Sequence, residues 1–140
     1  MRQKNILWIV AAATVALLGG LWWRQQNSAA LAALPPEVAQ AMAMVQAKGC
    51  AACHSHDGAA GIGPSWRGSW GKVREFTGGG SAVFDAAYLR ESISAPAAQL
   101  VQGFPNLMLP VGLSEDELQQ LELLLRYLAE PNSGVAAADG

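Results

Sequence analysis

Charged residues are scarce in this sequence of 140 residues. They make up only 14% of the chain, whereas soluble domains average roughly 25%. Residues 25–140 carry six basic and eleven acidic side chains, a net charge of −5. A nucleic-acid-binding surface needs many Lys and Arg side chains, so this shortage excludes nucleic acid as a partner. The acidic balance favours electrostatic steering toward basic partner surfaces.

Cysteine and histidine are scarcer still, with two residues of each. A zinc site would need further Cys or His at ligand spacing, but beyond Cys50, Cys53 and His54 only His56 is left. A thioredoxin-like dithiol site would need βαβ surroundings, which the sequence does not indicate. A disulfide between the two cysteines in an oxidising compartment stays open as an alternative.

Apolar residues, at 51% of the chain, are most concentrated near the N-terminus, where residues 6–23 form an uncharged run. A helix of this length is about 27 Å long, which just spans the hydrocarbon core of a bilayer. Arg2 and Lys4 precede the run, so the charge asymmetry predicts a cytoplasmic N-terminus. We therefore predict a single transmembrane anchor over residues 1–24 in a bacterial inner membrane, with the rest on the periplasmic side. A signal peptide cleaved near Ala30-Leu31-Ala32 is the alternative.

Beyond the anchor the sequence predicts a linker over residues 25–36, a domain over 37–130 and a flexible tail over 131–140. Apolar residues at helical spacing predict helices over 37–48, 85–94 and 114–129. Ser114 and Glu117 match a capping box at the start of the last helix. Residues 55–82 have no sustained period and indicate a long loop. The sequence therefore predicts an all-α fold whose core is too small without a buried prosthetic group.

Residues 50–54 read Cys-Ala-Ala-Cys-His, which is the attachment pattern of c-type haem. Two thiols at this spacing match the two vinyl groups of haem, and the adjacent His54 can place its imidazole on the iron. We predict one covalent haem c at Cys50 and Cys53, with His54 as an iron ligand.

The sixth iron ligand must approach from the opposite face of the haem, so it should come from a remote loop. Met42 and Met44 lie on the helix before the motif and are better explained as core packing. His56 is too close to His54 to reach round the ring. Met108 remains, in a proline-flanked loop between two predicted helices. Coordination by His and Met raises the reduction potential and leaves no open position, which favours electron transfer.

Further contacts to the haem are expected from the segment after the motif. A ligating histidine usually donates its second ring N–H to an oxygen, and the carbonyl of Pro64 is our candidate for His54. An ordinary loop proline is the alternative. Trp66, Arg67 and Trp70 could reach the haem propionates, Arg67 by charge and the indoles by hydrogen bonds. Simple packing and surface charge would explain these three residues equally well.

These motifs resemble class I c-type cytochromes, and more narrowly the cytochrome c domain fused to subunit II of bacterial cytochrome c oxidases. The matching stretches are residues 48–55, 61–68, 87–93, 103–108 and 113–114. The resemblance implies a fold of three to five helices around one haem. It also implies that Pro64 bonds the proximal histidine and that Met108 is the distal ligand.

The chain departs from this family at several points. Ala41 and Val45 stand where the first helix of the family usually has a glycine and an aromatic residue, and Leu109 separates Met108 from Pro110. These departures fall on the first helix and on the methionine loop. The copper-binding domain of subunit II is missing.

The sequence thus predicts a membrane-anchored mono-haem cytochrome c. Its function would be to carry single electrons between respiratory or photosynthetic redox complexes, as an electron-transfer protein and not an enzyme. The alternative is a haem relay subunit of a larger membrane oxidoreductase complex. A ligand-binding haem protein is disfavoured, because Met108 would close the sixth position.

Overall fold

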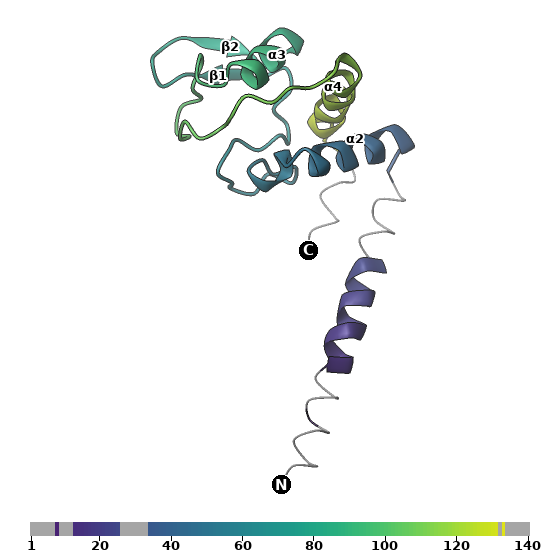
Figure 1. Cartoon of the computed structure of the whole chain (residues 1–140). Coiled ribbons are helices and arrows are strands. Elements are labelled where there is room, and N and C mark those ends of the chain that lie inside the picture. The colour runs from purple at the N-terminus through teal and green to yellow at the C-terminus, as the bar shows by residue number, and fades with distance from the viewer. Residues whose placement is uncertain (1–7, 9–12, 26–33, 132, 134–140) are drawn as a thin grey trace.

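The structure is a computed structural model that describes residues 8, 13–25, 34–131 and 133 (Figure 1). Much of the predicted anchor, most of the predicted linker and nearly all of the predicted tail lie outside the described residues. The predicted domain over residues 37–130 lies within them.

Three α-helices of the domain begin and end close to the predicted positions. They are α2 (Pro36–Ala47), α3 (Ala86–Ser94) and α4 (Glu115–Ala129). Helix α3 is capped by Asp85, whose carboxylate accepts a hydrogen bond from the backbone N–H of Tyr88 at 2.9 Å. The capping box of α4 is confirmed, because Ser114 and Glu117 each bond the other's backbone N–H.

The prediction of an all-α fold is wrong. Strands β1 (Val73–Glu75) and β2 (Ser81–Val83) form an antiparallel pair in which Arg74 lies opposite Ala82. Residues 78–80, all glycine, lie in the turn between the strands. Strands of three residues are too short to show the alternation of apolar and polar residues by which a strand is recognised in a sequence.

The prediction of a transmembrane helix is also corrected. Among the described residues, none of the helices is both long enough and apolar enough to cross a membrane. The described helix near the N-terminus covers residues 13–25, about 20 Å at ~1.5 Å per residue.

The core of the domain lies chiefly between α2 and α4. Ala41 and Val45 of α2 and Leu124 and Leu125 of α4 are fully buried there. Ala41 and Val45 give α2 small aliphatic side chains where it packs against α4. Tyr127 of α4 lies partly buried against this core.

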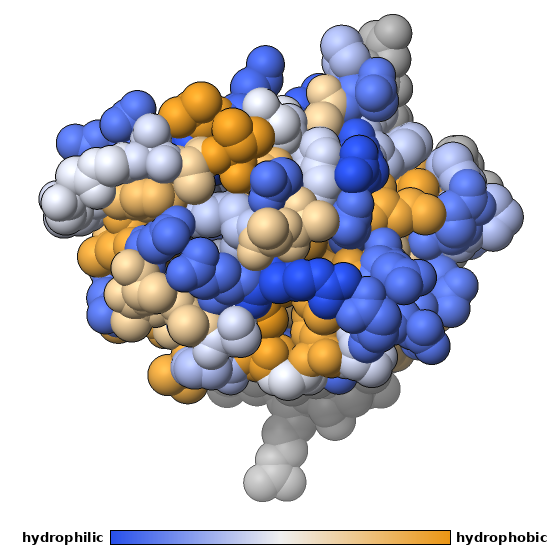
Figure 2. All heavy atoms as spheres, turned by 90° about the horizontal axis from the view of Figure 1, so that it is seen from above, coloured by the Kyte–Doolittle hydropathy of each residue, from blue (hydrophilic) through white to orange (hydrophobic). Residues whose placement is uncertain are grey.

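Helix α3 and the two strands lie on the other side of the domain from α2, and a long connection leads from α3 to α4 (Figure 1). This connection pairs with the free edge of β1, because Gln102 donates its backbone N–H to Glu75 O and Thr77 donates to Leu100 O. Arg90 and Glu115 join α3 to α4 by a bidentate ion pair. Seen from above, hydrophobic patches lie between hydrophilic residues on the surface (Figure 2).

Replacing Leu125 by alanine should lower the free energy of unfolding by about 2–5 kcal/mol, because the side chain is fully buried between the helices. Leu123→Ala is the matched control, since Leu123 belongs to the same helix and is 37% exposed. Chemical denaturation of both variants measures the effect. Equal losses of stability would contradict the assignment of the core.

Candidate functional site

A cavity of about 430 Å³ opens between the two sides of the domain. This volume is typical of ligand sites, which range over roughly 300–1,000 Å³. Its walls are mainly apolar and include Phe84, Leu89, Ile93, Leu100 and Phe104. Six of the residues predicted for the haem site line this cavity. They are Cys50, Cys53, His54, Pro64, Trp66 and Met108.

The two cysteines lie on a tight turn that directly follows α2. Gly49 ends the helix with a φ of 76°, a conformation that glycine adopts without strain. The 3-10 turn η1 (Cys50–Ala52) follows, and both Cys53 and His54 donate their backbone N–H to Cys50 O. Both thiols are free. Burial raises the pKa of the Cys50 thiol, and the charge of Lys48 partly offsets this rise.

The imidazole of His54 is held by the segment that returns beside it. Its Nδ1 lies 2.9 Å from Pro64 O, so the hydrogen bond expected from the sequence is present. A carbonyl oxygen can only accept, so Nδ1 carries a proton, and in the neutral imidazole the lone pair then lies on Nε2. The ring also stacks on Trp66, with centroids 5.3 Å apart and the planes within 8° of parallel. His54 is thereby fixed in the tautomer that can bind a metal through Nε2.

Two glycines allow the returning segment to lie this close to His54. A Cβ on Gly63 would lie 2.5 Å from His54 Cε1, and a Cβ on Gly61 would lie 2.7 Å from Cys53 O. Gly63 also donates its backbone N–H to Cys53 O at 2.9 Å. The space beside the imidazole is therefore open only to a residue without a side chain.

Met108 reaches the same cavity from the connection between α3 and α4. It is 38% exposed and lies between the more exposed Leu107 and Leu109. Backbone bonds from Leu107 to Pro105 O and from Val111 to Ile93 O hold the loop on either side. The structure thus brings His54 and Met108, which are remote in sequence, to one cavity.

The other methionines and the second histidine that were weighed as ligands are not part of the described lining. Met42 is buried in the core and Met44 packs against it. This agrees with their interpretation as packing residues. His56 follows His54 by two positions but does not line the cavity.

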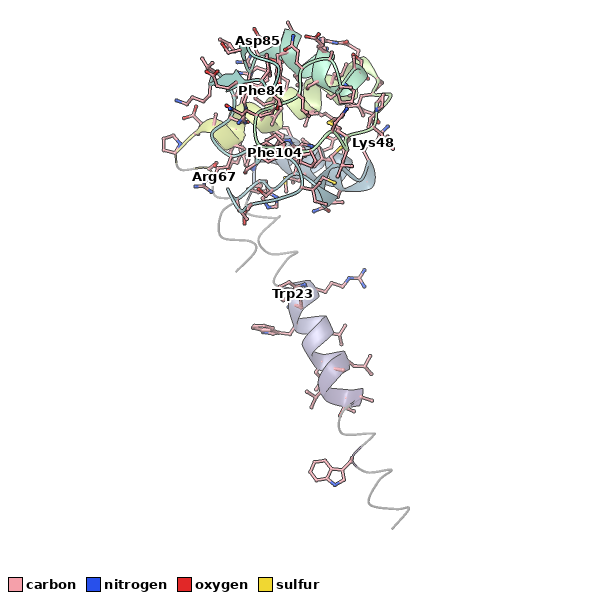
Figure 3. All side chains as sticks on the ribbon, turned by 90° about the vertical axis from the view of Figure 1, so that its left-hand side faces the viewer. Trp23, Lys48, Arg67, Phe84, Asp85 and Phe104 are labelled. Atoms are coloured by element: carbon pink, nitrogen blue, oxygen red, sulfur yellow. The ribbon has the colours of Figure 1, made fainter. Side chains whose placement is uncertain are left out.

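Arg67 and Trp70 are likewise not among the lining residues. Trp70 packs against Phe84, and the guanidinium carbon of Arg126 lies 4.6 Å from the centre of a Trp70 ring. In Figure 3 Arg67 lies toward the opposite edge of the domain from Lys48, which does line the cavity. Nη1 of Arg67 is buried and has no hydrogen-bond partner among the described residues. That Arg67 and Trp70 contact a bound group stays a prediction.

Arg74 and Gln99 are among the polar residues of the cavity wall that the sequence analysis missed. Arg74 is the inward residue of β1, between the exposed Val73 and Glu75. Gln99 follows α3, and its Oε1 is buried with no hydrogen-bond partner among the described residues. The only sequence signal for Arg74 was the alternation of a strand too short to be recognised.

Comparison of the sequence with protein-family models and with curated proteins finds no match.

These residues fit a metal that arrives within a larger organic cofactor. Over the part of the chain that is described, no group of three or more His, Cys, Asp or Glu side chains could hold a bare metal ion. A metal on His54 Nε2 would need most of its ligands from elsewhere, and a porphyrin supplies four ring nitrogens. The apolar walls suit such a planar group, and the two free thiols at its edge offer covalent attachment.

Replacing Gly63 by alanine should displace the His54 ring and break its bond to Pro64, because the new Cβ would meet the ring at 2.5 Å. We expect a loss of stability of about 1–3 kcal/mol, as for other overpacked sites. Nitrogen NMR of the His54 imidazole should show that Nδ1 no longer donates to Pro64.

Gly112→Ala is the control, since a Cβ there meets nothing within 4 Å. If Gly63→Ala left the imidazole spectrum as unchanged as Gly112→Ala does, the close approach of Gly63 to His54 would be disproved.

Proposed function

We propose that this protein is a mono-haem c-type cytochrome that carries single electrons. The observation that carries the proposal is the cavity itself, whose lining brings together two free thiols, an imidazole and a thioether among mainly apolar side chains. The resemblance of the surrounding motifs to class I c-type cytochromes supports the same conclusion. When bound, haem supplies an iron that changes between the ferrous and ferric states by one electron.

Cys50 and Cys53 attach the cofactor in this proposal. Each thiol adds across a vinyl group, so that a carbon–sulfur bond forms and the thiol hydrogen passes to the neighbouring vinyl carbon. The addition needs no oxidant. Attachment by two such bonds suits a compartment outside the cytoplasm, where a lost cofactor is not easily replaced.

His54 and Met108 bind the iron. The hydrogen bond from His54 to Pro64 O orients the ring and makes Nε2 a stronger electron-pair donor to the metal. Among the described residues that line the cavity, Met108 supplies a thioether. A methionine ligand raises the reduction potential of the iron. With both ligands in place there is no open position for a substrate, so the residues favour electron transfer over catalysis at the iron.

Donor and acceptor would be redox complexes that exchange one electron with this protein. The acidic balance of residues 25–140, with six basic and eleven acidic side chains, favours partners with basic docking surfaces.

Mass spectrometry of the intact protein tests the attachment directly. We expect the mass of the polypeptide plus one haem, retained under denaturing conditions because the bonds are covalent. A polypeptide without added mass, or with Cys50 and Cys53 joined as a disulfide, would contradict the proposal.

Replacing Met108 by alanine should lower the reduction potential and allow the reduced protein to bind carbon monoxide, because the sixth position opens. Leu109→Ala is the matched control, because Leu109 lies next to Met108 in the cavity lining but has no sulfur atom to bind iron. Redox titration and the absorption spectrum under carbon monoxide measure both effects. Binding of carbon monoxide at equilibrium by the reduced native protein would show that the six-coordinate assignment is wrong.

A further inference from the structure

The indole of Trp66 lies face to face with the imidazole of His54. The ring centroids are 5.3 Å apart and the planes are within 8° of parallel. This is the offset stacked arrangement that aromatic pairs prefer. Among the ring pairs of the described residues, it is the one that includes His54. The side chain proposed as an iron ligand therefore has an electron-rich ring against its face.

Trp66 is fixed in this position by burial and by its backbone. It is 8% exposed and belongs to the core of the domain. Its backbone N–H donates to Ser55 O at 2.8 Å, and its carbonyl accepts the hydroxyl of Ser69 at 2.7 Å. Ser69 is itself buried. The indole cannot turn away from the imidazole without disturbing the core, so the stack is a built feature of the site.

The stack affects the two oxidation states of a bound iron differently. The face of an indole is the negative side of its quadrupole, and it attracts positive charge. An imidazole that binds iron gives electron density to the metal, and it gives more to ferric than to ferrous iron. The ring of His54 is therefore more positive in the oxidised state. Contact with Trp66 should stabilise that state more than the reduced one.

We propose that Trp66 lowers the reduction potential of the iron by stacking on His54. The inference rests on the proposed haem and on His54 as its ligand. Trp66 is a positioning residue in this account, because it acts on the iron through the imidazole. It acts in the same direction as the hydrogen bond to Pro64, which makes Nε2 a stronger electron-pair donor. Both oppose Met108, since a methionine ligand raises the potential.

The first test compares the reduction potentials of the haem-loaded full-length protein and its variants by redox titration. Trp66→Leu fills much of the space but removes the aromatic face, so its potential should rise. Trp66→Phe keeps a ring with a weaker negative face and should lie between the native protein and Trp66→Leu. Tyr127→Leu is the control, because Tyr127 packs against the core but does not line the cavity. It should lower the stability and leave the potential unchanged.

A second test keeps the shape of the side chain and covers the case in which Trp66→Leu does not fold. Growth on fluorotryptophan replaces all five tryptophans of the chain by indoles whose faces are poorer in electrons. The potential of the native sequence should rise on this replacement. The potential of Trp66→Phe should stay constant, because its remaining tryptophans do not contact His54.

The inference is overturned if Trp66→Leu leaves the potential unchanged or lowers it, or if Trp66→Phe rises as far as Trp66→Leu. It is also overturned if Tyr127→Leu raises the potential as much, or if fluorotryptophan shifts the native sequence no more than it shifts Trp66→Phe. Failure of the proposed function itself would look different, because the native protein would then carry no haem and have no haem potential to measure.

Discussion

The hydrogen bond between His54 Nδ1 and Pro64 O is the constraint on which the rest of the site depends. At 2.9 Å it places the proton of the neutral imidazole on Nδ1, so that the lone pair of Nε2 can bind a metal. It requires the segment 61–64 to lie against the Cys53–His54 backbone, which in turn requires glycine at positions 61 and 63. The same segment delivers Trp66, whose ring stacks on His54. A short stretch of chain therefore sets the position, orientation and tautomer of one side chain.

The cavity explains why so small a domain is built as two sides joined by long connections. The pair α2 and α4 forms one packed side, while α3, β1 and β2 lie apart from α2 (Figure 1). Between them remains a volume of about 430 Å³ with mainly apolar walls. A planar apolar cofactor in this space would bury the apolar side chains that line the cavity, and this burial would stabilise the fold. In our account the haem is therefore both the functional group and a part of the core.

Local features of the fold could be predicted from the sequence, and long-range ones could not. The cap at Ser114 could be predicted because a cap and its helix are adjacent in the chain. The Cys-Ala-Ala-Cys-His motif at residues 50–54 could be recognised for the same reason, because its residues are contiguous in the chain. Strands β1 and β2 were missed because three residues do not establish a period, and their pairing is a tertiary property. The membrane helix was predicted from an apolar run, whereas no helix among the described residues is long and apolar enough to cross a membrane.

The same distinction applies within the site. Met108 was selected by eliminating other residues, and it does line the cavity with His54. Arg67 and Trp70 were selected because they follow the motif closely, but closeness in sequence did not bring them to the cavity. Arg74 was missed because its inward position follows from the short strand β1.

Iron K-edge X-ray absorption of the purified protein tests the central claim most directly, because it reports the atoms bound to the metal. The account predicts one iron per chain with five nitrogen ligands, four from the porphyrin and one from His54, and one sulfur ligand from Met108. Absence of iron, or an iron without a sulfur ligand, would contradict it.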